Sequence, residues 1–224
     1  MNMENLKKLC NENKVFFINF FLFVFIGGIV FFGFNKDEIL FYFNQHQNFI
    51  LNKFFILSTN LAQELGIIPV LIILLLFRYS LFILSSLSLI ITTLTVGIIK
   101  TFTALPRPIL FFENNPNVHL NLIDGVNMHR FMSFPSGHTA AAFAMFLILA
   151  YFFKNIYAKH ICFFLALFVA LSRVYLLQHF FRDVYFGSIL GVFITVILFM
   201  LAYQVKWFNE LDKKAGLIHT IFKK

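Results

Sequence analysis

The sequence is poor in charged residues and almost lacks cysteine. Charged residues make up 12% of the chain, about half the roughly 25% that a soluble domain usually carries. The only cysteines, Cys10 and Cys162, exclude a small secreted module held together by disulfide bonds. Apolar residues amount to 60% and include 35 Phe, more than a single soluble core of this length could hide. The composition therefore predicts an integral membrane protein.

The formal net charge of +8 does not indicate a nucleic-acid partner. Basic residues occupy short gaps between apolar runs and the regions near the two ends, and no basic stripe is interleaved with aromatic residues. We therefore expect no nucleic acid to bind, and we interpret the basic residues as determinants of membrane topology.

Apolar runs long enough to cross a bilayer, about 20 residues each, recur along the chain. They predict six transmembrane helices, at about residues 15–34, 57–77, 81–99, 135–153, 161–177 and 184–203. The first run is long for a signal-peptide core and no small-residue cleavage pattern follows it, so we expect it to remain as a span. Residues 1–224 are expected to form one membrane-embedded domain, whose only long connection is residues 101–134.

The distribution of basic residues predicts the orientation of these spans. If the N-terminus is cytoplasmic, 11 of the 18 Lys and Arg residues lie on that side, among them Lys223 and Lys224. We therefore expect a multi-pass protein of the inner (cytoplasmic) membrane with both termini in the cytoplasm. The connection 101–134 then faces the periplasm or the exterior.

Ionisable residues near membrane depth are costly and are functional candidates by default. Lys100 closes the third predicted span, His138 lies in the first turn of the fourth, Arg173 lies near the end of the fifth, and Asp183 opens the sixth. Under the predicted topology all four lie at the outer ends of their helices. A bundle of these helices would gather them at one mouth, together with Arg107 and His179.

The residue types in this group suit a phosphate ester. Lys100, Arg107 and Arg173 offer three cations, and a guanidinium fork matches phosphate oxygens. The helix start at Ser136 and Gly137 can accept an anion on its free N–H groups, and Gly137 lets the backbone approach a ligand.

The two histidines supply the remaining chemistry. His179 and Asp183 are four residues apart and would face each other on a helix, where the carboxylate fixes the imidazole tautomer and leaves the other nitrogen as a nucleophile or a base. His138 is a second imidazole that can protonate a leaving group.

Three short motifs carry these residues in a fixed order and spacing. They are Lys100 followed after six residues by Arg107-Pro108, then Pro135-Ser136-Gly137-His138, then Ser172-Arg173 followed by His179 and Asp183. Together they resemble the three motifs of the type 2 phosphatidic acid phosphatase superfamily, which is related to acid phosphatases and vanadium haloperoxidases. The resemblance implies an all-α bundle of six transmembrane helices with an acid phosphatase/vanadium haloperoxidase-like core.

The resemblance also implies a role for each motif residue. His179 would be the nucleophile that forms a phosphohistidine, Asp183 would orient it, and His138 would be the general acid. The phosphoryl oxygens would be held by Lys100, Arg107, Ser136, Gly137 and Arg173. No metal and no other cofactor is implied.

The substrate class implied by the resemblance is a lipid phosphate or diphosphate, such as phosphatidic acid, phosphatidylglycerophosphate, undecaprenyl pyrophosphate or lipid A. A lipid phosphotransferase that uses the same intermediate stays an alternative. An anion or lipid transporter is the alternative from another class, although the ionisable residues gather at one end instead of running through the membrane. The oligomeric state stays open.

Some polar residues outside the motifs receive no fixed role. Glu64, inside the second predicted span, either reaches the site or bonds to a neighbouring helix. Glu113, His129 and Arg130 in the outer connection are candidates for contact with a lipid headgroup, since loops often carry specificity. Gly187 and Gly191 form a GxxxG step, which we interpret as helix packing within the chain.

Overall fold

The computed structural model describes residues 3–214 and 216–218, and all regular structure in this part of the chain is helical. Lys223 and Lys224, which contributed to the predicted orientation, lie outside the described residues. The helices are α1 (Met3–Glu12), α2 (Lys14–Gly33), α3 (Lys36–Gln45), α4 (Phe49–Asn60), α5 (Glu64–Phe77), α6 (Tyr79–Thr103), α7 (Pro108–Phe112), α8 (Gly137–Phe152), α9 (Ile156–Tyr175), α10 (Phe181–Ala202) and α11 (Lys206–Asp212).

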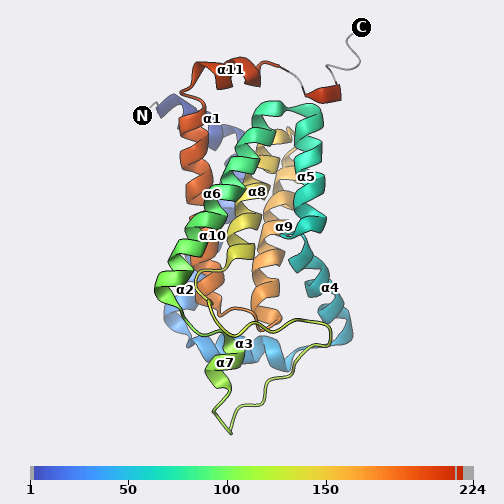
Figure 1. Cartoon of the computed structure of the whole chain (residues 1–224), viewed down its shortest axis with the longest axis vertical. Helices are drawn as coiled ribbons and strands as arrows, with labels where there is room; N and C mark the ends of the chain where they lie inside the picture. The colour runs from blue at the N-terminus through green and yellow to red at the C-terminus, as the bar shows by residue number, and fades with distance from the viewer. Residues whose placement is uncertain (1–2, 215, 219–224) are drawn as a thin grey trace.

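The long helices run side by side as one bundle with α8 at its centre (Figure 1). Helix α8 packs against α6, α9 and α10, and most of its side chains are buried. Small residues make this possible, because Ala140, Ala142 and Ala144 let neighbouring helices approach closely. On α10, a Cβ added at Gly191 would lie 2.2 Å from the carbonyl oxygen of Ala140, so the GxxxG step does pack within the chain.

Four described helices are long and apolar enough to cross a membrane: α2, α6 with its continuation, α9 and α10. The pair α4 and α5 makes a fifth span if its two parts count as one. Helix α8, in the place of the predicted fourth span, has 16 residues and belongs to the shorter apolar helices. An all-helical membrane bundle is confirmed, and the number of six crossings stays a prediction.

The predicted second span, 57–77, is broken. Helix α4 ends at Asn60, α5 begins at Glu64, and the two axes differ by 46°. The break depends on a close backbone approach, because a Cβ at Gly66 would lie 2.1 Å from the carbonyl oxygen of Leu61. The sequence predicted one span over residues 57–77, whereas the structure divides its polar first part and its apolar second part at a bend.

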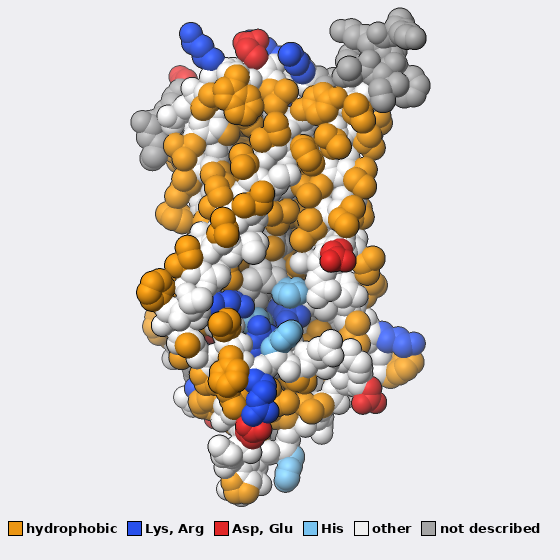
Figure 2. Space-filling view, viewed as in Figure 1, with side chains coloured by type: hydrophobic (Ala, Val, Ile, Leu, Met, Phe, Trp, Pro, Cys, Tyr) orange, Lys and Arg blue, Asp and Glu red, His pale blue; other side chains and the backbone are white. Residues whose placement is uncertain are grey.

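The face of the bundle seen in Figure 2 is apolar along most of its length, and the charged side chains on this face lie mainly toward its ends. Phe32 on α2, 88% exposed, and Phe102 on α6 are among the side chains that point outward. This distribution fits a lipid-facing surface.

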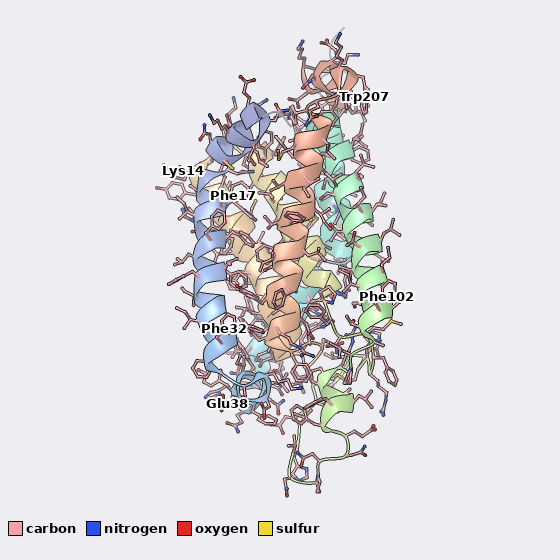
Figure 3. The ribbon with its side chains drawn as sticks, turned by 90° about the vertical axis from the view of Figure 1, so that its left-hand side faces the viewer. Lys14, Phe17, Phe32, Glu38, Phe102 and Trp207 are labelled. Atoms are coloured by element: carbon pink, nitrogen blue, oxygen red, sulfur yellow. The ribbon has the colours of Figure 1, made fainter. Side chains whose placement is uncertain are left out.

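Helices α1 and α11 lie at one end of the bundle, whereas α3, α7 and the long connection lie at the other (Figure 1). Lys14 and Trp207 lie near the first end, and Glu38 and Phe102 lie toward the second (Figure 3). The described parts next to both termini therefore share one end. Which side of the membrane this end faces stays a prediction.

Candidate active site

The connection between α6 and α8 folds back over one end of the bundle and carries Arg107 inward. Helix α6 ends where Ala104 adopts a left-handed backbone conformation, with φ of 44°. The two limbs of the connection are then joined by hydrogen bonds from Arg107 N to the carbonyl of Arg130 and from Ser133 N to the carbonyl of Leu105, each 2.9 Å long. This pairing fixes Arg107 above the bundle end.

The guanidinium of Arg107 is buried and held on two sides. Its Nε donates to the carbonyl of Phe131 at 2.9 Å, and its Nη1 donates to Gln178 Oε1 at 3.1 Å. Burial lowers the pKa of Arg107, and the charge of Asp183 opposes that shift. Arg107 is therefore a fixed cation beside the connection that precedes α10.

The motif around Ser136 forms the N-terminus of α8. The sequence predicted a span from about residue 135, but the helix begins at Gly137, because Ser136 is the N-cap. Its Oγ accepts a hydrogen bond from Thr139 N at 3.4 Å, and its own N–H donates to the carbonyl of Asp183 at 2.9 Å. The N-cap is thereby attached to the start of α10, and first-turn N–H groups of α8 point toward the bundle end.

His179 and Asp183 face each other, but not on one helix. His179 precedes α10, which begins at Phe181, and Asp183 lies in the first turn of that helix. The two side chains are 1% and 0% exposed, and His179 Nδ1 lies 3.4 Å from Asp183 Oδ2. That separation is an electrostatic contact, and Nδ1 makes no proper hydrogen bond. Burial lowers the pKa of His179, although Asp183 opposes that shift, so the imidazole is neutral near pH 7.

The Asp183 carboxylate has two further partners that hold its Oδ2. Ser133 Oγ donates to it at 2.5 Å and Phe180 N donates to it at 3.1 Å. Ser133 comes from the connection and Phe180 from the turn before α10. Because two donors fix this oxygen, the carboxylate is oriented toward the His179 ring.

Arg173, in the last turn of α9, is almost fully buried and organises the connection that holds His179. Its carbonyl accepts hydrogen bonds from Gln178 N and His179 N, each at 3.0 Å. Its Nη1 donates to Thr59 Oγ1 on α4 at 2.6 Å, while its buried Nε makes no hydrogen bond. The guanidinium therefore keeps donor capacity for a bound anion.

Two cavities meet at His138. The first, called the apolar groove here, has a volume of about 760 Å³ and runs between α5, α6 and α8. Its lining is apolar except near Lys100 and His138 and at Ser86 and Thr93. The second, called the polar chamber, has a volume of about 270 Å³ and is bordered by α4, α9 and the connection, with Arg173 and His138 in its lining. Lysine, arginine and histidine side chains gather near this end of the bundle, below the broad apolar surface (Figure 2).

Comparison with known proteins agrees with this geometry. The family model of the PAP2 superfamily matches residues 81–207, more than half of the chain. The chain belongs to the PAP2 superfamily. No curated protein sequence matches it significantly.

Two solved structures resemble the fold. LpxE of Aquifex aeolicus is 28% identical, with a TM-score of 0.63, and the match covers 73% of this chain and 93% of that protein. The first transmembrane PAP2-type phosphatidylglycerolphosphate phosphatase from Bacillus subtilis is 22% identical, with a TM-score of 0.60. That match covers 84% of this chain and 96% of the Bacillus subtilis protein, and it supports the fold alone.

The three PAP2 motifs come together at one end of the bundle. Ser136 bonds to the backbone of Asp183, the carbonyl of Arg173 bonds to the backbone of His179, and Arg107 bonds to Gln178, the residue before His179. Lys100, Gly137 and His138 line the same groove. The structure thus juxtaposes all eight predicted residues, and their individual roles stay proposals.

The polar residues to which the sequence assigned no fixed role lie in different parts of the structure. His129 lines the polar chamber, and its pKa is lowered by burial and by the nearby Arg107, Arg173 and Lys100. Glu113 and Arg130 form a salt bridge with each other on the exposed connection. Glu64 is an exposed residue in the first turn of α5 and lines neither cavity.

Four residues at the site were not found by sequence reasoning. Ser133 holds Asp183, Gln178 holds Arg107, Thr59 holds Arg173, and Gln63 contacts His138. Each is joined to its partner across 50 to 114 residues of sequence, so no local pattern could have indicated the contact. Within the described residues, no three His, Cys, Asp or Glu side chains gather as a metal site.

Proposed function

We propose that this protein is a membrane phosphatase that hydrolyses a lipid phosphate monoester or diphosphate. The observation that carries the proposal is the meeting of a cluster of basic side chains and a hydrocarbon-sized groove. Lys100 and His138 line the end of the apolar groove of about 760 Å³, within the usual range of roughly 300–1,000 Å³ for ligand sites. A phosphate among the cations would leave an attached acyl or isoprenyl chain free to lie in the groove.

The positions of the side chains support a reaction in two displacements. His179 Nδ1 faces Asp183, which leaves Nε2 to attack the phosphorus. The bond from phosphorus to the ester oxygen breaks as the bond from Nε2 to phosphorus forms. The departing oxygen takes a proton from His138, and the Asp183 carboxylate stabilises the positive charge on the phosphohistidine ring.

Water then completes the cycle. His138 accepts a proton from a water molecule whose oxygen attacks the phosphorus, the bond to His179 Nε2 breaks, and inorganic phosphate leaves. Lys100, Arg107, Arg173 and the first-turn N–H groups of α8 would stabilise the charge on the phosphoryl oxygens in both steps. We propose that this charge stabilisation makes a divalent metal unnecessary.

The proposed site faces the outer side of the cytoplasmic membrane. The excess of basic residues on the side of the termini supports this orientation. The substrate would then be a lipid of the outer leaflet, which reaches the groove sideways from the bilayer.

A substrate panel tests the proposed function. Purified protein in detergent is incubated with phosphatidic acid, phosphatidylglycerophosphate, undecaprenyl pyrophosphate and lipid A, and released phosphate is measured. Wild-type protein should release phosphate from at least one lipid, and His179→Ala should release none. No release by the wild type from any member, with the protein folded, would overturn the proposal and favour a transporter.

A further inference from the structure

The break between α4 and α5 brings two polar side chains into the site. Thr59, in the last turn of α4, accepts a hydrogen bond from Arg173, and Gln63, inside the break, contacts His138 with 3.0 Å between the two Nε2 atoms. These contacts reach two different helices, α9 and α8. No PAP2 motif residue lies in this segment, since the family match begins at residue 81.

The two contacts and part of the groove lining all lie at the bend between α4 and α5. Residues four apart on a straight helix share one face, so Thr59 and Gln63 would otherwise stack along the same line. The 46° bend turns α5 relative to α4, and Ala62 and Ile67 on either side of Gln63 line the apolar groove. Gln63 itself lines the polar chamber. It therefore lies at the wall between the two cavities, directly against the proposed general acid.

We propose that Gln63 is a positioning residue for His138, an inference that rests on the proposed function. A glutamine amide has a donor end and an acceptor end that exchange when the amide turns by half a rotation, and the two ends are assigned by the hydrogen-bond network. The structure places the amide Nε2 against His138 Nε2; after a half rotation of the amide, Oε1 faces the ring and Gln63 accepts a hydrogen bond from His138 Nε2–H. This bond holds one proton on Nε2 and leaves Nδ1 as the nitrogen that gives and regains the proton.

The amide suits this task better than other side chains would. It binds the Nε2–H of both the neutral and the protonated ring, so the ring stays oriented while the Nδ1 proton moves to the ester oxygen and a proton from water later replaces it. A carboxylate at this position would favour the protonated ring and delay the release of its proton. An apolar side chain would leave the ring free to rotate.

Two substitutions separate positioning from a general structural role. Gln63→Leu should lower kcat for a lipid phosphate about three- to tenfold, the size of one net hydrogen bond, and should leave kcat for p-nitrophenyl phosphate nearly unchanged. That leaving group departs without a proton, so the orientation of His138 matters little to it. Gln63→Glu should move the alkaline limb of the kcat–pH profile to higher pH, because the carboxylate retains the proton on His138.

The matched control is Glu64→Gln, which changes a charge at the next residue, where the side chain is exposed and lines neither cavity. It should leave both the substrate ratio and the pH profile unchanged. Equal losses of Gln63→Leu on both substrates, or an unmoved alkaline limb in Gln63→Glu, would overturn the positioning role while wild-type phosphatase activity still supports the proposed function. Histidine-selective NMR gives a readout without turnover: the His138 ring should titrate at higher pH in Gln63→Glu than in wild type, and an unchanged titration would refute the contact.

Discussion

Placing a methyl group on Gly191 should disturb the site from a distance, because this glycine lets α10 touch the backbone of α8. A Cβ at Gly191 would lie 2.2 Å from the carbonyl oxygen of Ala140, whereas real Cβ atoms keep at least 3.0 Å. The obstacle is backbone, so in Gly191→Ala the two helices must separate locally by about 0.8 Å, which displaces α8 relative to α10. The motif at the start of α8 would move with it, since Ser136 is one turn before Ala140 and bonds to Asp183.

The expected size of the effect follows from that displacement. Overpacking of this kind usually costs about 1–3 kcal/mol of stability. A misplacement near 1 Å at a reacting centre can cost on the order of 10²-fold in rate. We therefore expect Gly191→Ala to remain folded and to lower kcat for lipid phosphate by about 10- to 100-fold. Gly187→Ala should act in the same direction, because its Cβ would lie 2.7 Å from the carbonyl oxygen of Ser136.

The assay compares these variants with Gly33→Ala in detergent, by thermal unfolding and by phosphate release. Gly33 also lies in a transmembrane helix, and a Cβ there would have no neighbour within 4 Å. That control should keep wild-type kcat and gain slightly in stability, because alanine favours helix more than glycine does. Wild-type kcat in Gly191→Ala would show that the contact between α8 and α10 does not set the geometry of the site.

Four further predictions concern the mechanism and the topology. Phosphatase activity should survive excess EDTA and be inhibited by vanadate, which adopts the five-coordinate geometry of the transferring phosphorus; loss of activity that magnesium or zinc restores would refute the metal-independent mechanism. In a cysteine-free background, a cysteine at Asn117 should react with an impermeant thiol reagent in intact cells and one at Lys154 should not, and the opposite labelling would reverse the topology. His179→Ala should abolish turnover of lipid phosphate and p-nitrophenyl phosphate alike, because without the imidazole of residue 179 neither substrate can form the covalent phosphohistidine intermediate. His138→Ala should lose about 10²–10⁴-fold on the lipid substrate and far less on p-nitrophenyl phosphate; equal losses, with phosphorus–oxygen cleavage limiting both rates, would restrict His138 to phosphate binding.

The break in the second predicted span could not be predicted from the sequence. A hydropathy pattern joins residues 57–77 because it averages over neighbours, and it cannot detect that Gly66 touches the backbone of Leu61. The helical spacing of His179 and Asp183 gave the correct pairing for an incorrect reason. The two side chains meet because a turn before α10 brings His179 back toward the first turn of that helix.

The sequence by itself determined that this protein lies in a lipid bilayer, where its helices approximately are, and which residues gather at one end of the helical bundle. These properties are local: apolar runs mark membrane depth, and Lys100, Arg173 and Asp183 lie near the helix ends that the motifs occupy. Only the tertiary structure decided what orients those residues. Ser133, Gln178, Thr59 and Gln63 reach their partners across 50 to 114 residues. Thr59 and Gln63 make their contacts from the α4–α5 segment, beside its bend, whereas Ser133 and Gln178 make theirs from connections between helices at the end of the bundle. Hydrogen bonds require positions accurate to a few tenths of an ångström, and packing alone sets positions that closely.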